Sequence, residues 1–242
     1  MTVQPTAPPL PGRTLFDQDW HNLTFLHWPV APATIAPFFP PGIRPDVYEG
    51  DGRGLSYVGL VPFHMHGAGV GRLRAPYFGD FLETNVRLYS VDDQGRHGVL
   101  FRTLEAQRLL TVLLARYGYG IPYTWARMRA HRHEDRLTYT ARRRWPKRGL
   151  RSRVVVDIGA RTEPTDVETW FTARWGLHSR VAGRTLWTPN HHEPWPLHEA
   201  QLVQLDDQLV AAAGVHVDRS ALLRPLWTPG VHTRFGRPTR VA

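Results

Sequence analysis

Alternating side chains along residues 80–91 predict a β-strand whose two faces differ. The even positions from Leu82 to Leu88 form a mostly apolar face, and the odd positions from Phe81 to Tyr89 form a polar face bordered by aromatic residues. A turn of two aspartates, a glutamine and a glycine follows at 92–95. Residues 97–103 are therefore expected to pair back on this strand as a hairpin.

Further runs of aliphatic, β-branched and aromatic residues predict a chain dominated by strands. They cover residues 23–28, 54–65, 97–103, 124–133, 135–144, 151–160 and 199–205, with an extended segment at 231–241. Strand content of this order predicts a mainly β (α+β) fold, an antiparallel β barrel or sandwich with a few packed helices.

Four segments predict the helices that pack on these strands. The apolar residues at helical spacing over 106–117 are typical of a helix that packs deeply, and Gly118, Gly120 and Pro122 end it. Asp166 is expected to cap a second helix that runs to Trp175. Residues 31–39 and 208–213 predict shorter helices or turns.

The length and composition predict one domain. A chain of 242 residues with 42% hydrophobic residues builds a single sizeable core, so we expect one domain over residues 16–242 behind a flexible, Pro-rich terminus at 1–15. No apolar run is long enough to cross a bilayer, and residues 1–11 lack the pattern of a signal peptide. We therefore expect a cytoplasmic protein without a membrane partner.

The charge and cysteine content narrow the chemistry. Cysteine is absent, which excludes disulfides, thiolate nucleophiles and Cys-based zinc sites. The net charge is +9, and 29 of the 30 basic residues are arginine, with Lys147 as the single lysine. The arginines cluster over 142–153, which indicates either a nucleic-acid surface or solvated strands joined by a turn. We favour the second interpretation because no recognition motif accompanies the cluster.

Three polar residues share the odd face of the strand over 80–91. Glu83, Asn85 and Arg87 point the same way, with neighbours about 7 Å apart. A carboxylate, an amide and a guanidinium on one face would orient a small anionic or carbonyl ligand, and the arginine fork suits a carboxylate. The alternative is a solvent-facing Glu–Arg pair of little energetic value. The flanking Phe81 and Tyr89 favour a pocket.

Two His-x-His pairs raise the possibility of a metal site. His64 with His66, and His131 with His133, would each project from one strand face, and Glu83 would be needed as a third ligand. Because the chain contains 13 histidines, such pairs also arise by chance. We therefore expect no metal and no other cofactor.

Other motifs are less specific. No nucleophile elbow, Walker loop or dinucleotide fingerprint is present in the sequence. The segment His-His-Glu-Pro-Trp-Pro at 191–196 is held rigid by its prolines, and it would either line the mouth of a cavity or brace the sheet.

A set of ordered motifs gives the chain a family resemblance. It resembles the YqjF-like group of unknown function, and the motifs run over nearly the whole chain. They lie at 23–30, 40–42, 61–63, 81–87, 115–123, 194–197, 205–214 and 235–238. That group is similar in fold to acetoacetate decarboxylase, so the resemblance implies a barrel of the acetoacetate decarboxylase-like type.

The same resemblance exposes one departure at the centre of the decarboxylase chemistry. Phe81-x-Glu83 matches an aromatic-x-Glu motif, and Arg116 with Pro122 matches an Arg-x5-Pro motif that the decarboxylases continue with two lysines. Here Tyr123 and Thr124 stand in place of those lysines. The group that would form a Schiff base with a β-keto acid is therefore missing.

The resemblance implies a cavity that takes a small carboxylate- or carbonyl-bearing molecule. Tyr123 would donate a hydrogen bond or a proton to a carbonyl oxygen, Glu83 would act as acid or base, and Arg87 would hold an anion. The remaining expected ligand contacts are His27, at the place of an active-site arginine of the decarboxylases, with Asn85, Tyr89 and Arg116.

Other classes of function remain open. An enzyme would be lyase- or hydrolase-like and independent of lysine. The alternatives are a non-catalytic structural or interaction module that binds a partner through its basic surface, with nucleic acid the less favoured partner, and a metalloenzyme that uses histidines. Pairing at a sheet edge makes a homodimer a further expectation.

We predict that the protein forms no imine with acetoacetate or pyruvate. Imine formation needs an amine of lowered pKa, and Lys147 lies in an Arg-rich turn far along the chain from Pro122. Borohydride reduction in the presence of either compound, followed by mass spectrometry, should leave the protein unmodified. A reduced adduct on Lys147 would overturn the prediction.

Overall fold

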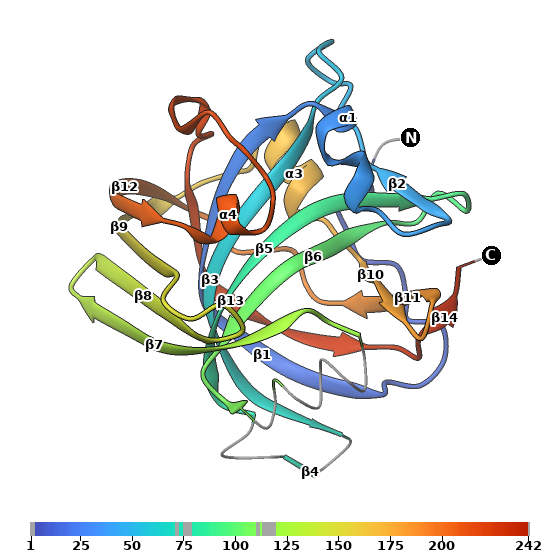
Figure 1. The fold of residues 1–242 in the computed structure, drawn as a ribbon, viewed down its shortest axis with the longest axis horizontal. Coiled ribbons are helices and arrows are strands. Elements are labelled where there is room, and N and C mark those ends of the chain that lie inside the picture. Colours follow the sequence, from blue (N-terminus) through green and yellow to red (C-terminus); the bar gives the residue numbers. More distant parts are fainter. Residues whose placement is uncertain (1–2, 71–72, 75–78, 110–111, 113–119, 242) are drawn as a thin grey trace.

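Strands make up most of the protein in the computed structural model, which describes residues 3–70, 73–74, 79–109, 112 and 120–241 (Figure 1). The mainly β class is confirmed. Helices are few and short in the described part of the chain, and they lie against the sheet rather than forming a layer of their own.

The strands and helices have the following bounds. The strands are β1 (Phe16–Val30), β2 (Ile43–Pro45), β3 (Ser56–Val70), β4 (Leu73–Arg74), β5 (Phe81–Asp92), β6 (His97–Ala106), β7 (Tyr123–His133), β8 (Arg136–Trp145), β9 (Arg151–Arg161), β10 (Gly176–Val181), β11 (Arg184–His191), β12 (His198–Asp207), β13 (Leu226–Phe235) and β14 (Thr239–Arg240). The helical segments are α1 (Pro32–Ile35), η1 (Ala36–Phe38), α3 (Asp166–Thr172), α4 (Leu209–Ala212) and η2 (Arg219–Ala221).

Hydrogen bonds join these strands into a closed ring. Within the described residues the ring runs β6-β7-β8-β9-β12-β13-β1-β3-β5 and returns to β6. Most neighbours are antiparallel, whereas β6 runs parallel to both β7 and β10. Strands β10 and β11 bridge from β6 to β13 and so close a second, smaller circuit that shares β13, β1, β3, β5 and β6 with the first.

Two hydrophobic cores lie on opposite sides of the shared strands. One face of β1, β3 and β5 packs into a core that also contains α3, with Phe25, Phe63 and Tyr89 among its members. The other face packs into a second core, with Trp28, Leu60 and Leu88 among its members. Because side chains alternate along a strand, these strands form a wall that is buried on both sides over much of its length.

The predicted strands agree well with the observed ones, and the differences have local causes. The prediction omitted β2, β4, β10 and β11, which are short or contain glycine or proline. The cap of α3 is Thr165 rather than Asp166, because the Thr165 hydroxyl accepts the Glu168 amide and the Glu168 carboxylate accepts the Thr165 amide. The helix predicted over 106–117 falls mostly outside the described residues.

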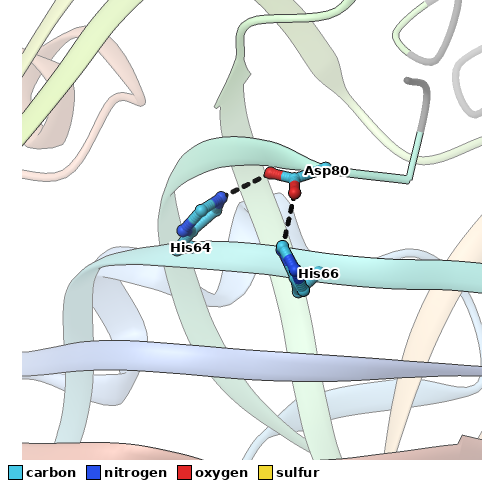
Figure 2. A group of neighbouring side chains, drawn as sticks. All are labelled: His64, His66 and Asp80. Atoms are coloured by element: carbon cyan, nitrogen blue, oxygen red, sulfur yellow. Dashed lines mark hydrogen bonds and ion pairs between the residues drawn. The ribbon is translucent and has the colours of Figure 1, made fainter. Parts of the chain in front are cut away.

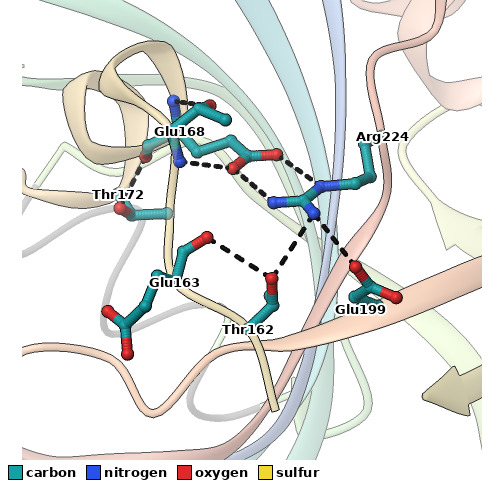
Figure 3. A network of polar contacts seen from close by, with 7 residues as sticks. Thr162, Glu163, Glu168, Thr172, Glu199 and Arg224 are labelled. Atoms are coloured by element: carbon teal, nitrogen blue, oxygen red, sulfur yellow. Dashed lines mark hydrogen bonds and ion pairs between the residues drawn. The ribbon is translucent and has the colours of Figure 1, made fainter. Parts of the chain in front are cut away.

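Figure 3 shows how Arg224 links α3 to β12. Arg224, which precedes β13, donates from Nε and Nη2 to the two oxygens of Glu168 at 2.9 and 2.7 Å. It also reaches Glu199 on β12 at 3.2 Å. One arginine therefore joins the first turn of α3 to β12 and to the start of β13. The helix ends at Thr172, two residues before Arg174.

The proline-rich N-terminal segment lies against the same region. Val3 is buried in the first core, the indole of Trp175 donates to the Gln4 carbonyl at 2.8 Å, and the Leu15 amide donates to the Phe235 carbonyl. The mobility expected for residues 1–15 stays a prediction. None of the helices described here is long and apolar enough to span a membrane.

We predict that Glu168→Ala lowers the free energy of unfolding by about 2 kcal/mol. The substitution removes the carboxylate that accepts the Thr165 amide in the cap, and it breaks the ion pair of this buried carboxylate with Arg224. Urea unfolding followed by circular dichroism measures the change. Asp157→Ala is the matched control, because it removes an exposed pair with Arg136 and should cost less than about 1 kcal/mol. Equal losses in the two variants would contradict the role of this cap.

Candidate functional site

A cavity of about 120 Å³ lies in the first core, on the odd face of β5. A cavity of roughly 150 Å³ holds a benzene-sized molecule, so this one suits a ligand of about five or six heavy atoms. Its wall is mostly apolar, with a few polar groups, which is the usual composition of a ligand site. The polar side chains that line it are Gln18, Glu83, Asn85, Arg87, Tyr123, Thr172, Arg174, Asn190 and His192.

Four of the residues selected from the sequence form one hydrogen-bonded chain along this wall. The Tyr123 hydroxyl donates to Glu83 Oε2 at 2.6 Å, and Asn85 Nδ2 donates to Glu83 Oε1 at 3.2 Å. Arg87 Nε in turn donates to Asn85 Oδ1 at 2.9 Å. Glu83, Asn85 and Arg87 are alternate residues of β5, and Tyr123 is the first residue of β7. The structure thus brings the predicted carboxylate, amide, guanidinium and phenol together.

Burial dominates the electrostatics of Glu83. Its side chain is 2% exposed, and burial raises the pKa of its carboxyl to about 7 against the opposing effects of Tyr123, Asn85 and Arg87. The carboxyl is therefore close to half protonated at neutral pH. A group with this property exchanges protons readily under physiological conditions, as a general acid or base must.

Tyr123 and Arg87 keep fixed roles near neutral pH. Burial, followed by the Glu83 charge, raises the pKa of Tyr123 well above its ordinary value, so the phenol stays protonated. Burial lowers the pKa of Arg87 from its ordinary value, but the guanidinium remains charged. Among the described residues Arg87 donates one hydrogen bond, from Nε, and packs over Phe101 at 5.8 Å. No hydrogen bond from the terminal nitrogens of its fork is found within the described part of the chain.

His27 and Tyr89 lie behind the wall of the cavity and do not line it. His27 Nε2 is 2.5 Å from the Tyr89 hydroxyl, and its ring stacks on Phe171 with 3.8 Å between the centroids. Burial, with the charges of Arg87 and Arg174, lowers the pKa of His27 well below its ordinary value, so the imidazole is neutral. Neither ring lines the cavity. Their predicted contact with a ligand stays a prediction, and the structure places both rings outside the set of side chains that line this cavity.

Gly59 lies directly beside both His27 and Arg87. Gly59 on β3 pairs with Arg87 on β5 and with His27 on β1. A Cβ atom at position 59 would lie 2.8 Å from His27 Nε2 and 3.1 Å from Arg87 Cγ. Both side chains therefore occupy the space that a side chain at 59 would need.

Arg174 is a cavity residue that the sequence did not single out. Its guanidinium forms a buried ion pair with Asp46, donates from Nε to the Trp170 carbonyl at 2.7 Å, and packs over the rings of Trp170 and Tyr89. Its Nη2 is buried and has no described hydrogen-bond partner. No local pattern reveals it, because its partner Asp46 is 128 residues away along the chain.

Two residues of the aromatic segment at 191–196, His192 and Trp195, line the cavity, and Trp195 also packs against the first core, so the segment combines both of its expected roles. Trp195 stacks on Trp20 with 5.8 Å between the ring centroids, and His192 lies 4.6 Å from Trp195. Burial lowers the pKa of His192 to about 4, so this imidazole is neutral at physiological pH. Nearby Asn190 has a buried Oδ1 without a hydrogen-bond partner in the described structure.

The other selected residues lie elsewhere. Arg116 falls outside the described residues. Lys147 is exposed in the turn between β8 and β9 and does not line the cavity, in keeping with its predicted solvation. The exposed arginines of β7 to β9 run across the sheet in register, with Arg127 beside Arg142 and Arg142 beside Arg151.

Comparison of the sequence with known families finds one model that matches residues 17–232. It is the DUF2071 family, described as an uncharacterized conserved protein (COG2071). A curated relative is the uncharacterized protein YqjF of Bacillus subtilis (strain 168). It is 27% identical over 217 residues, which cover 86% of each chain.

Comparison of the structure finds the acetoacetate decarboxylase fold, as the resemblance implied. Acetoacetate decarboxylase from Legionella pneumophila matches with a TM-score of 0.67 and 13% identity, covering 98% of this chain and 92% of that one. The enduracididine biosynthesis enzyme MppR complexed with pyruvate matches with a TM-score of 0.63 and 13% identity, covering 98% and 91%. An acetoacetate decarboxylase-like enzyme from Sphingomonas wittichii RW1 matches with a TM-score of 0.62 and 12% identity, covering 96% and 94%. At these identities the likeness shows the fold.

We predict that Glu83 makes stability depend on pH. The folded protein holds the Glu83 proton up to a pKa of about 7, whereas the unfolded chain releases it near 4.5. The stabilisation is therefore complete below about pH 4.5 and is lost as the pH rises to about 7, by on the order of 3 kcal/mol. Urea unfolding should show this loss as a fall in the unfolding free energy of the parent protein relative to that of Glu83→Gln. The comparison between the two proteins is needed because buried His27 and His192, whose lowered pKa values make stability rise with pH, contribute equally to both.

Glu199→Gln serves as the control, because Glu199 is an exposed carboxylate outside the cavity. This variant should keep the pH dependence of the parent. If Glu83→Gln also follows the parent curve across the range, Glu83 ionises as it does in the unfolded chain.

Proposed function

The chain belongs to the DUF2071 family of uncharacterized conserved proteins, and on that premise we propose that it binds a small molecule carrying a carboxylate and a carbonyl group in the Glu83 cavity. The observation that carries the proposal is the hydrogen-bonded chain from Tyr123 through Glu83 and Asn85 to Arg87 along one cavity wall. Polar groups of this kind are costly to bury, so a wall that presents them to a cavity favours a polar ligand.

Two guanidinium groups would hold the carboxylate of the ligand. The terminal nitrogens of Arg87 are available for a bidentate contact, and the buried Nη2 of Arg174 lacks a described partner. Arginine binds carboxylates through paired hydrogen bonds that are stronger than those between neutral groups. The apolar residues around them exclude water, which strengthens the attraction further.

The phenol and the carboxyl would act together on the carbonyl group. When Glu83 is protonated, its hydroxyl is able to donate to the Tyr123 oxygen, which frees the phenolic hydrogen for the carbonyl oxygen of a ligand. The pair would thereby polarise the carbonyl and supply a proton to it. The catalytic form of the proposal is a lysine-independent lyase- or hydrolase-like reaction with Tyr123 and Glu83 as the proton-transferring groups.

The structural relatives support the class of ligand. MppR of the same fold has been observed with pyruvate, a small keto acid. The cavity volume of about 120 Å³ suits a molecule of this size. In the motif that resembles that of the decarboxylases, Tyr123 stands in place of their Schiff-base lysine, so a carbonyl group bound there would face a hydrogen-bond donor in place of an amine.

Pyruvate and propionate form a matched pair of probes, because both carry a carboxylate and pyruvate alone carries a keto group. We predict that the parent protein binds pyruvate more tightly, as measured by isothermal titration calorimetry or ligand-observed NMR. Tyr123→Phe should reduce pyruvate affinity about tenfold, to near the propionate value, while Arg87→Gln should weaken both probes about tenfold or more. Affinity should also fall as the pH rises through about 7, since ionised Glu83 repels the carboxylate.

Arg127→Gln removes an exposed arginine from the strand that begins with Tyr123, and it should leave both affinities unchanged. Glu83→Gln should bind pyruvate with an affinity that no longer depends on pH near 7. Equal binding of both probes by the parent, Tyr123→Phe and Arg87→Gln proteins would rule out these roles.

A further inference from the structure

Three side chains outside the cavity converge on one point. His64 Nε2 lies 2.6 Å from Asp80 Oδ1, and His66 Nδ1 lies 2.7 Å from Asp80 Oδ2 (Figure 2). The potential ligand atoms of the three residues all lie within 4.8 Å of one another. Among the described residues no other group of three such side chains meets this condition.

The strand register explains why these residues meet. His64 and His66 are alternate residues of β3 and so share one face. The pairing of Met65 with Phe81 ends the β3–β5 ladder, which places Asp80 immediately beyond it and next to His66. Two imidazoles therefore come from one strand, and the carboxylate comes from the entry to its neighbour.

This cluster lies on the opposite face of the wall from the cavity. Phe63 pairs with Glu83 and His64 pairs with Leu82, so Glu83 and the two histidines point to different sides of the sheet. The sequence had suggested Glu83 as the third ligand for this histidine pair. The structure replaces it with Asp80, and none of the three clustered residues lines the cavity.

The surroundings are rich in further histidines. His21 on β1 pairs with His64, and its ring lies 5.8 Å from that of His66. Two residues before His21, Asp19 pairs with His66, and its Oδ1 lies 2.6 Å from Nδ1 of His232 on β13. The side chains of His64, His66 and Asp80 are between 36% and 52% exposed, so an ion from solvent can reach them.

We propose that His64, His66 and Asp80 bind a divalent transition-metal ion of the zinc type. Two imidazole nitrogens and one carboxylate are an established ligand set for such ions, with water or substrate filling the remaining positions. Asp80 would exchange its two histidine hydrogen bonds for contacts with the ion after small side-chain rotations. The bound ion would tie β3 to the start of β5, the strand that carries Glu83. This inference replaces the expectation of no metal, and it does not depend on the proposed ligand of the cavity.

Zinc binding to the full chain, stripped of metal with a chelator and dialysed, tests the proposal. Isothermal titration calorimetry and native mass spectrometry should show one Zn²⁺ per chain with a dissociation constant of about 1 μM or below. Asp80→Asn keeps the size of the side chain and removes its charge, and it should weaken binding at least about 100-fold, because loss of an outer partner of a metal site alone costs 10–100-fold. Zn²⁺ should raise the Tm of the parent and leave that of Asp80→Asn unchanged.

The double variant His131→Ala/His133→Ala is the matched control, because it removes the other His-x-His pair, which is exposed at the end of β7. It should bind Zn²⁺ as the parent does. Substitution of Co²⁺ for Zn²⁺ gives visible absorption bands that report imidazole and carboxylate coordination independently of affinity. The proposal is overturned if the parent binds no Zn²⁺ at 100 μM, if Asp80→Asn binds it as tightly as the parent, or if the control variant loses it.

Discussion

Strands β1, β3 and β5 are buried on both faces over much of their length, and the rest of the structure depends on this double burial. A wall of this kind admits a polar side chain only where its donors and acceptors find partners, since an unpaired buried polar group is costly. Glu83 and Asn85 meet that condition through Tyr123, through each other and through Arg87. The chain from Tyr123 to Arg87 is therefore built on strands, whereas loops supply many functional sites.

The protein stabilises its buried carboxylates in different ways, and this difference singles out Glu83. Glu105 lies directly against the Arg143 guanidinium, with Thr103 completing the network. Burial raises the pKa of Asp46, but Arg174 and His97 hold it below its ordinary value. Glu83 reaches a cation only through Asn85, and its direct partners are a phenol and an amide. Burial raises the pKa of this carboxyl, and its two neutral partners and the more distant Arg87 only partly oppose that effect.

The sequence was informative where one strand determines the outcome by itself. Alternation along β5 was enough to place Glu83, Asn85 and Arg87 on one face, and the family resemblance added Tyr123 opposite them. Contacts between distant segments were out of reach: Arg174 depends on Asp46, and Asp80 meets His64 only through the β3–β5 register. Alternation placed Tyr89 on the correct face but gave no depth, and the motif resemblance that suggested His27 gave none either, so neither could show that both rings lie behind the cavity wall. Thr165 was a readable cap, since Glu168 stands three residues after it, as a capping box requires.

Gly59 controls how far the charged end of Arg87 extends. The ring of His27 and the stem of Arg87 meet over the bare backbone of that glycine, closer than any side chain would permit. An alanine there would have to push the imidazole off Tyr89 or the arginine stem toward Phe101. The place of the guanidinium along the cavity wall is therefore set in part by the absence of a side chain on the neighbouring strand. Position 59 does not line the cavity, yet a larger residue there would have to move a side chain that does.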